Sequence, residues 1–133
     1  MMAISTGFAG RIIQLTDALD RYDAVSNQVC ELDRILRDEG FDTIISSRFA
    51  HPDRVHIRIN RDDLKLREDD VLIVHYYGFS EGLAAWLKNQ YCTKIMVYHN
   101  ITPESFFAYD DPAYGFCKDG RVQLKEIIDL FSF

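Results

Sequence analysis

The sequence predicts an α/β fold with a Rossmann-like, doubly wound parallel sheet, and two observations carry this prediction. Residues 71–75 and residues 94–98 are continuous runs of mainly apolar and β-branched residues, which is typical of parallel strands covered on both faces. Segments with helical periodicity alternate with predicted strands in the order strand, helix, strand, strand, helix, strand, helix. Histidines follow or end the two apolar runs, at His75 and His99. Because ligands bind at the carboxyl edge of an open α/β sheet, both histidines are predicted to lie at a binding edge.

The first half of the chain is predicted to supply one helix and most of the short strands. A strand over residues 11–15 is followed by a polar loop over residues 16–23 and by a helix that ends at Gly40, the expected helix stop. Residues 42–47 are predicted to form the second strand. Residues 55–59 alternate between apolar and polar side chains and predict a short, half-exposed strand. The charged stretch from 60 to 70 predicts a surface loop.

Three helix starts are expected in the second half. Ser80 is a candidate cap for a helix that carries Leu83 and Leu87. The sequences at residues 102–104 and 111–112 each combine a capping side chain with a proline at the first helical position. The last helix is expected to reach about residue 131, with a bend or break near Gly120 because glycine weakens a helix. The chain ends where a further strand would start, so the sheet is expected to lack its last one or two strands.

Composition predicts one globular domain and excludes several classes of protein. The chain has 133 residues, of which 47% are hydrophobic, and a net charge of -6 without any run of Lys and Arg. A general nucleic-acid binder is therefore excluded. The cysteines are isolated and odd in number, which favours reduced thiols in a cytosolic protein over disulfides or a metal site; they are Cys30, Cys92 and Cys117. No signal peptide or membrane-spanning segment is visible.

The candidate site residues each have a functional and a structural interpretation. The loop over residues 22–27 lies where backbone N–H groups and a helix start can hold a phosphate, but Asp23 or Ser26 can equally serve as the helix cap. The glycine-rich dinucleotide fingerprint is absent there. His99 can act as a base, as a hydrogen-bond donor or as a structural group, and the same holds for His75. Residue type alone favours the structural interpretation for both.

Three segments together resemble the N-terminal half of family 4 glycosyltransferases of the GT-B fold. They are residues 22–27, residues 71–78 and the sequence from Lys94 through Glu104, which continues into Phe106 and Phe107. Residues 120–125 are similar to the helix that follows in that family. The resemblance runs in order over residues 10–130.

This resemblance implies retaining transfer of a sugar from a nucleotide-sugar donor, in a cleft between two Rossmann-like domains. The N-terminal domain of such an enzyme mainly binds the acceptor. His99 would be the catalytic residue near the reaction centre, and no metal or tightly bound cofactor is implied. The residues implied to contact donor or acceptor are Asp23, Ala24, Val25, Ser26, Tyr76, Gly78, Asn100 and Thr102.

Two departures from the family shape the expected function. Asp23 and Ala24 stand where many members have a glycine pair, and the C-terminal donor-binding domain is absent from this sequence. The chain alone is therefore expected to be inactive, because a half-site cannot stabilise a departing diphosphate. The expected partners are a sugar, glycan or lipid-linked acceptor, a second polypeptide with the donor domain, or a second copy of the chain. The expected location is the cytoplasm or the inner face of a membrane.

A different class of function also fits the sequence. The chain can be a non-catalytic Rossmann-like module that binds a small phosphorylated ligand or a protein partner. One or two local groups would be sufficient for such a ligand.

Overall fold

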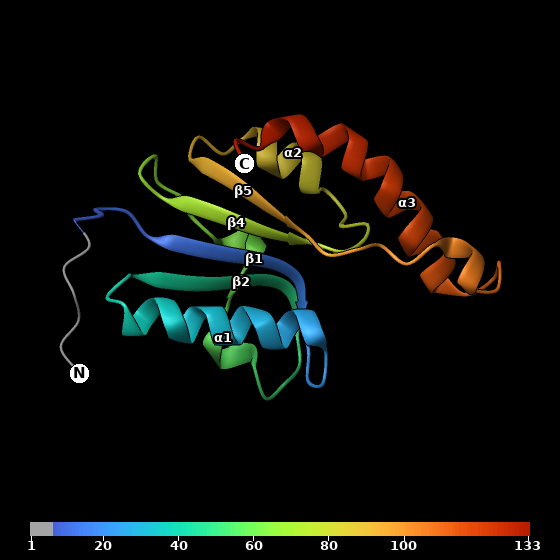
Figure 1. The fold of residues 1–133 in the computed structure, drawn as a ribbon, viewed down its shortest axis with the longest axis horizontal. Coiled ribbons are helices and arrows are strands. Elements are labelled where there is room, and N and C mark those ends of the chain that lie inside the picture. The colour runs from blue at the N-terminus through green and yellow to red at the C-terminus, as the bar shows by residue number, and fades with distance from the viewer. Residues whose placement is uncertain (1–6) are drawn as a thin grey trace.

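The computed structural model describes residues 7–133 as a five-stranded, all-parallel sheet with helices on both faces (Figure 1). The strand order is β3-β2-β1-β4-β5. The strands are β1 (Ile12–Leu19), β2 (Thr43–Ala50), β3 (Ile59–Asn60), β4 (Val71–Tyr76) and β5 (Thr93–Tyr98). The α-helices are α1 (Ala24–Asp38), α2 (Leu83–Lys88) and α3 (Pro112–Ile127). The predicted fold class is confirmed.

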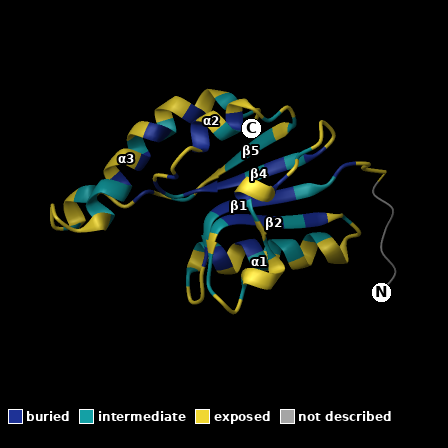
Figure 2. Ribbon diagram, turned by 180° about the vertical axis from the view of Figure 1, so that it is seen from behind, coloured by how far each residue is buried: buried dark blue, intermediate teal, exposed yellow. Residues whose placement is uncertain are grey.

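Helix α1 covers β1 and β2 on one face of the sheet. Its inner side places the fully buried Val29 against Leu19 and Ile45. Its outer side carries ion pairs at helical spacing, among them Arg34 with Asp38 and Arg37 with Asp33. Figure 2 shows this contrast as exposed residues along the outside of α1 and buried residues along the central strands. The amphipathic pattern thus fixes which side of α1 meets the sheet.

The larger core lies on the opposite face, between the sheet and helices α2 and α3. Leu72, Val74 and Tyr76 of β4 pack there with Leu87 of α2 and Ile127 of α3. These side chains are at most 2% exposed. The two faces of the sheet are therefore covered by different helices, as the doubly wound order requires.

Two glycines allow α3 to cross closely over the loop that follows β4. A Cβ atom on Gly120 would lie 2.8 Å from the Gly78 Cα atom, and a Cβ atom on Gly78 would lie 2.1 Å from the Phe116 ring. α3 continues as one helix through Gly120, so the break considered for this position does not occur. Gly120 serves close packing instead.

The first strand is longer than predicted. Residues 16–19, expected in a loop, continue β1, with Ala18 paired to Phe49 and Leu19 paired to Ala50 of β2. Leu19 is fully buried, so the apolar end of this segment belongs to the core. The strand was predicted to end too early because the polar residues Thr16 and Asp17 interrupt its apolar pattern.

The predicted strand over residues 55–59 is wrong for most of its length. Residues Val55–Ile57 form a 3-10 turn (η1), and only Ile59 and Asn60 pair with β2. Local turns take up the backbone N–H groups here, since those of Arg54 and Val55 both donate to the carbonyl of His51. The alternation of apolar and polar residues here therefore does not produce a strand that pairs along its whole length.

The charged segment over residues 60–70 is not simply a surface loop. It contains a short 3-10 turn, η2 (Arg61–Asp63), and it buries the side chains of Arg61, Leu64 and Asp70. Both carboxylate oxygens of Asp70 are hydrogen bonded, to the Arg11 guanidinium at 2.7 and 3.1 Å and to two backbone N–H groups. Burial raises the pKa of Asp70, but these hydrogen bonds outweigh burial and lower it overall. Hydrogen bonds from Arg11, which is distant in sequence, thus offset the cost of burying the Asp70 carboxylate.

The expected helix starts differ in outcome. Asp111 caps α3 through the Ala113 N–H group, as predicted. Ser80 does not cap α2 with its side chain, because α2 begins after Gly82 and the Ser80 hydroxyl donates to Asp17. The start expected at residues 102–104 gives only a single 3-10 turn, η3 (Glu104–Phe106). The last helix ends at Ile127 and is followed by a 3-10 turn, η4 (Ile128–Leu130).

The two outer strands of the sheet, β3 and β5, limit their unpaired backbone in different ways. β3 is only two residues long, which leaves little edge for pairing. Along β5, the Ser132 N–H group donates to the carbonyl of Lys94 and the Met96 N–H group donates to the carbonyl of Phe133. The last residues of the chain therefore occupy part of the β5 edge.

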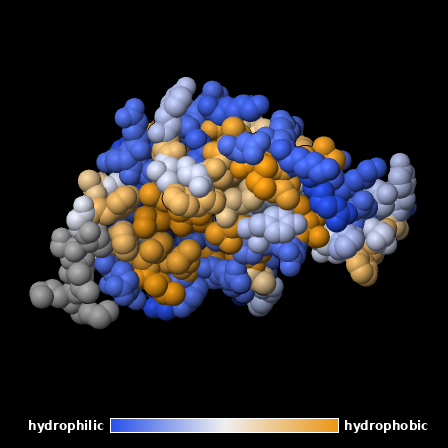
Figure 3. All heavy atoms as spheres, turned by 45° about the horizontal axis from the view of Figure 1, so that its top comes forward, coloured by the Kyte–Doolittle hydropathy of each residue, from blue (hydrophilic) through white to orange (hydrophobic). Residues whose placement is uncertain are grey.

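One apolar surface remains open on the α1 side of the sheet. Ile73 and Ile95 are paired in register with Gln14, whose side chain points to α1, so they share its face of the sheet. Both are only partly buried, and in the described chain no α-helix covers this part of β4 and β5. Figure 3 shows a broad group of hydrophobic side chains on the side of the molecule in view.

Candidate functional site

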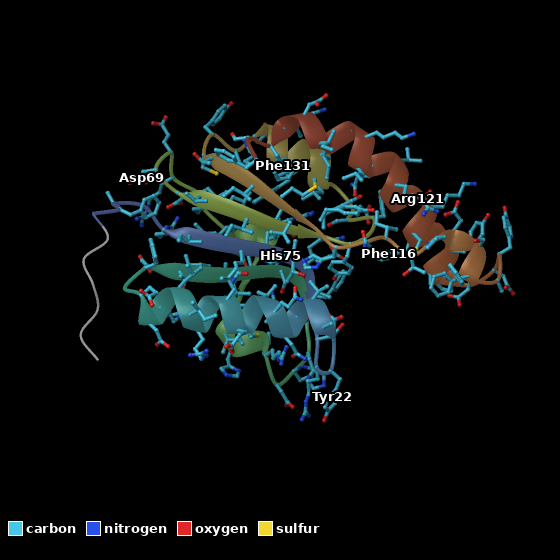
Figure 4. All side chains as sticks on the ribbon, viewed as in Figure 1. Tyr22, Asp69, His75, Phe116, Arg121 and Phe131 are labelled. Carbon is cyan, nitrogen blue, oxygen red and sulfur yellow. The ribbon has the colours of Figure 1, made fainter. Side chains whose placement is uncertain are left out.

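The candidate site lies at the carboxyl edge of the sheet, where the strand order changes direction between β1 and β4. Connections run outward from this point on both sides, which is where open α/β sheets leave a crevice for ligands. Gln14 of β1, His75 of β4 and His99 just after β5 meet here. Figure 4 places His75 among the central strands near their carboxyl ends, with Phe116 of α3 on the far side of that edge and Tyr22 well away from it.

A chain of hydrogen bonds fixes the orientation and tautomer of both histidines. The Gln14 side-chain amide donates to the carbonyl of Val29 at 2.9 Å, so its oxygen must face the other way and accept. His75 Nε2 lies 2.8 Å from that oxygen and therefore carries a proton. Neutral His75 then accepts at Nδ1 from His99 Nε2, at 3.0 Å. We call this arrangement the Gln14–His75–His99 chain.

Burial keeps this chain neutral. It lowers the pKa of His75 to about 4, and the neighbouring His99 acts in the same direction. Burial also lowers the pKa of His99, while the Asp23 carboxylate partly opposes that shift. With both rings neutral, the Nδ1 atom of His99 is left with a lone pair at the end of the chain.

In the loop between β1 and α1, the Asp23 carboxylate occupies the hydrogen-bond donors at the start of the helix. Asp23 Oδ2 accepts from the Ser26 N–H group at 3.1 Å and from the Ser26 hydroxyl at 2.7 Å. Ala24 is exposed at the start of α1, whereas Val25 is partly buried and packs against the smaller core. A phosphate could reach the Ser26 N–H group only if Asp23 moved away.

The residues expected on the acceptor side are not gathered at one place. Asn100 and Thr102 are exposed directly after His99. The Tyr76 side chain lies on the opposite face of the sheet, where its hydroxyl donates to the carbonyl of Gly120 at 2.7 Å and burial raises its pKa. Gly78 is closed off by Phe116. Position in the sequence placed all four near one edge, but strand alternation separates Tyr76 from His75.

Two residues of the site were missed. Gln14 is a long polar side chain inside an otherwise apolar strand, and that position was a usable signal. Tyr77 lies over the end of β1, where its hydroxyl accepts from the Ala18 N–H group at 3.2 Å. Burial raises the pKa of Tyr77 to about 12, so its hydroxyl stays protonated.

A second polar group was also missed at this edge, and it surrounds a small cavity. We call it the Arg48–Arg61 pocket; its polar lining includes Thr16, Asp17, Arg48, Arg61 and Ser80. The Ser80 backbone is fixed by Gln123, which accepts from its N–H group at 2.9 Å and donates to its carbonyl at 2.7 Å. The remaining cavity has room for about one water molecule.

The described residues hold no group of three or more metal-ligating side chains. All three cysteines are free thiols, and burial raises the pKa of each. No helix within residues 7–133 is both long enough and apolar enough to cross a membrane.

Comparison of the chain with protein-family models, curated protein sequences and solved structures finds no match.

Proposed function

We propose that this chain is the acceptor-side half of a retaining glycosyltransferase that uses a nucleotide-sugar donor. The observation that carries the proposal is the Gln14–His75–His99 chain at the switch point of the sheet. The resemblance of residues 22–27, 71–78 and 94–104 to family 4 enzymes supplies the class of reaction.

The chemistry of His99 supports this assignment. A neutral imidazole with a fixed tautomer offers Nδ1 as a hydrogen-bond acceptor, and sugar hydroxyl groups are the matching donors. The Gln14–His75 pair holds the ring in place, so little orientation is lost when a sugar binds. Asn100 and Thr102 add exposed polar side chains beside it.

The donor requires a second, donor-binding half, on the same or on another polypeptide. Asp23 occupies the hydrogen-bond donors of Ser26, and its negative charge disfavours a diphosphate at that loop. The acceptor would be a sugar, a glycan or a lipid-linked sugar. The proposed location is the cytoplasm or the inner face of a membrane.

Binding of neutral sugars to His99 tests the proposal. We expect the imidazole resonances of His99 to shift in NMR spectra when methyl α-glucoside, methyl α-mannoside or maltose is added. His99→Ala should abolish sugar binding, whereas His56→Ala, at an exposed position in η1, should leave it unchanged. If no neutral sugar perturbs His99, the acceptor role is contradicted.

Turnover by the isolated chain tests the division of labour. We expect purified protein to release no nucleotide from UDP-glucose or GDP-mannose above the rate of the His99→Ala variant, because the donor-binding half is needed to stabilise the leaving diphosphate. Turnover that His99→Ala abolishes would show that the chain is complete as a catalyst and would contradict this part of the proposal.

The second candidate is the non-catalytic module for a small phosphorylated ligand. Two arginines at the carboxyl edge of the sheet favour it, the buried Arg61 and the partly buried Arg48. If this candidate is correct, phosphate should shift resonances in the NMR spectrum of the protein, whereas none of the neutral sugars should.

A further inference from the structure

Arg61 is a buried cation without a carboxylate partner. The residue is only 6% exposed. Among the described residues, no carboxylate oxygen lies within 4.0 Å of the Arg61 guanidinium, the limit that defines an ion pair. Two of its nitrogens are hydrogen bonded to neutral groups, Nη2 to the carbonyl of Glu81 at 2.7 Å and Nη1 to the Ser80 hydroxyl oxygen at 3.4 Å. Its Nε atom is buried and has no hydrogen-bond partner. Such a group is costly to bury unless something compensates its charge.

The neighbouring charges do not compensate it. Burial lowers the pKa of Arg61, and repulsion from the Arg48 guanidinium lowers it further, while the nearby carboxylates oppose this shift only in part. Asp17 is the half-buried carboxylate of the pocket; it accepts from Ser80 at 2.7 Å but lies 3.6 Å from Arg48. Glu81 reaches Arg48 only at 3.9 Å, and its side chain is 81% exposed. Asp62 is exposed in the adjacent turn. Two cations therefore face one close anion within the pocket.

The pocket opens at the edge where ligands of parallel sheets bind. Arg48 lies near the end of β2, Asp17 near the end of β1, and Ser80 in the loop after β4. The cavity between them has room for about one water molecule, which is enough for one oxygen atom of a larger group. Arg48 is partly exposed; its guanidinium has ion pairs of 3.6 Å with Asp17 and 3.9 Å with Glu81 and lies 5.0 Å from the centre of the Phe49 ring, and none of these contacts is a short hydrogen bond that would prevent it from turning toward such a group.

We propose that the Arg48–Arg61 pocket binds an oxyanion, the carboxylate or phosphate group of a small-molecule ligand. Guanidinium groups present planar donors that match the oxygens of both groups. One oxygen would enter beside Arg61 and Ser80, and Arg48 would contact the outer oxygens. The pocket shares His75 as a lining residue with the Gln14–His75–His99 chain, but oxyanion binding there requires neither His99 nor a nucleotide sugar.

Thermal unfolding with inorganic phosphate and with acetate, each against sodium chloride at matched ionic strength, tests the site. We expect at least one of these oxyanions to raise the Tm of the wild-type protein above the chloride value. The same anion should shift the Nε–H resonance of Arg61 in NMR spectra. A response to phosphate but not to acetate assigns the phosphate class, and the reverse assigns the carboxylate class.

Three substitutions test whether Arg61 and Arg48 are the side chains that bind the oxyanion. Arg61→Met and Arg48→Met should each weaken the apparent Kd for the active oxyanion by at least about tenfold. Arg67→Met removes the same charge from an exposed position before β4, at the opposite edge of the sheet, and should leave the Kd unchanged. Arg48→Met keeps the test decisive if Arg61→Met does not fold, because Arg48 is only partly buried.

Two results would overturn the proposal. One is a wild-type protein that responds to phosphate and acetate no more than to chloride. The other is an equal response in Arg48→Met, Arg67→Met and wild type, which would mean general salt binding. Neither result bears on neutral-sugar binding at His99, so failure here is distinguishable from failure of the proposed function.

Discussion

His75 shows how strongly one residue depends on its surroundings. The residue is 5% exposed, accepts from His99 and donates to Gln14, so its hydrogen-bonding capacity is used while it is neutral. Protonation would add a donor at Nδ1 that faces the N–H group of His99. Burial and the His99 contact together explain why the pKa of His75 falls to about 4.

We expect the free energy of unfolding to fall as the pH is lowered from 6.5 toward 4. Between these values the unfolded chain binds a proton at His75 and the folded chain does not, so acid favours unfolding. The lowered pKa of His99 acts in the same direction. The loss attributable to His75 is about 3 kcal/mol over this range, from about 1.4 kcal/mol per pH unit. Urea unfolding at a series of pH values measures it.

The variant His75→Asn separates this effect from other titrations. Asparagine retains one donor and one acceptor but does not titrate, so the slope between pH 6.5 and 4 should become smaller. His56→Asn is the matched control at an exposed position and should keep the wild-type slope. Asp70, whose pKa is lowered, also contributes as the pH falls from about 5, but this titration is common to the wild type and both variants and cancels in the comparison. Identical slopes in His75→Asn and wild type would rule out His75 as the source.

At the scale of elements, α3 is positioned by contacts that helix propensity does not predict. Gly120 lies against the Gly78 loop, and Gln123 one turn later fixes the Ser80 backbone. The Tyr76 hydroxyl is bonded to the Gly120 carbonyl, which joins β4 to the same turn of the helix. This turn of α3 therefore sets the position of the loop that borders the Arg48–Arg61 pocket.

Two glycine-to-alanine substitutions in α3 should have opposite effects on stability. Gly120→Ala should lower the free energy of unfolding by about 1 to 3 kcal/mol, because its Cβ would meet the backbone of Gly78 and Phe79 at 2.8 Å. Gly115→Ala should raise it by about 0.5 to 1 kcal/mol, because the nearest atom lies 4.0 Å away and alanine favours helix. Chemical denaturation of both variants measures the difference. A gain in stability in Gly120→Ala would disprove the close approach.

At the scale of the whole molecule, the end of the chain closes part of an exposed sheet edge. The backbone of Ser132 and Phe133 bonds to β5 on both sides of Ile95. Phe131 packs against the larger core, whereas the Phe133 side chain is 79% exposed. Backbone pairing, and not burial of Phe133, is what this segment supplies to the edge.

Removal of residues 131–133 should therefore promote self-association. The Met96 N–H group and the Lys94 carbonyl would lose their partners, and an unpaired edge strand can pair with a second copy. Sedimentation velocity should show concentration-dependent dimers, and the Met96 amide should exchange faster with solvent. Phe133→Ala keeps the backbone bonds and should behave as wild type. A monomeric deletion variant with unchanged Met96 exchange would contradict the role of the segment.

The sequence by itself determined the parallel α/β sheet, the faces of α1 and the arrival of His75 and His99 at one edge. These features depend on local periodicity and on where apolar runs end, both of which are present in the chain order. Only the tertiary structure decided what those edge residues meet. Gln14 and His75 are 61 residues apart, and Ser80 and Asp17 are 63 apart. Burial of Arg61 without a carboxylate, and separation of Tyr76 from His75 by the sheet, follow from packing and strand alternation and not from any single segment.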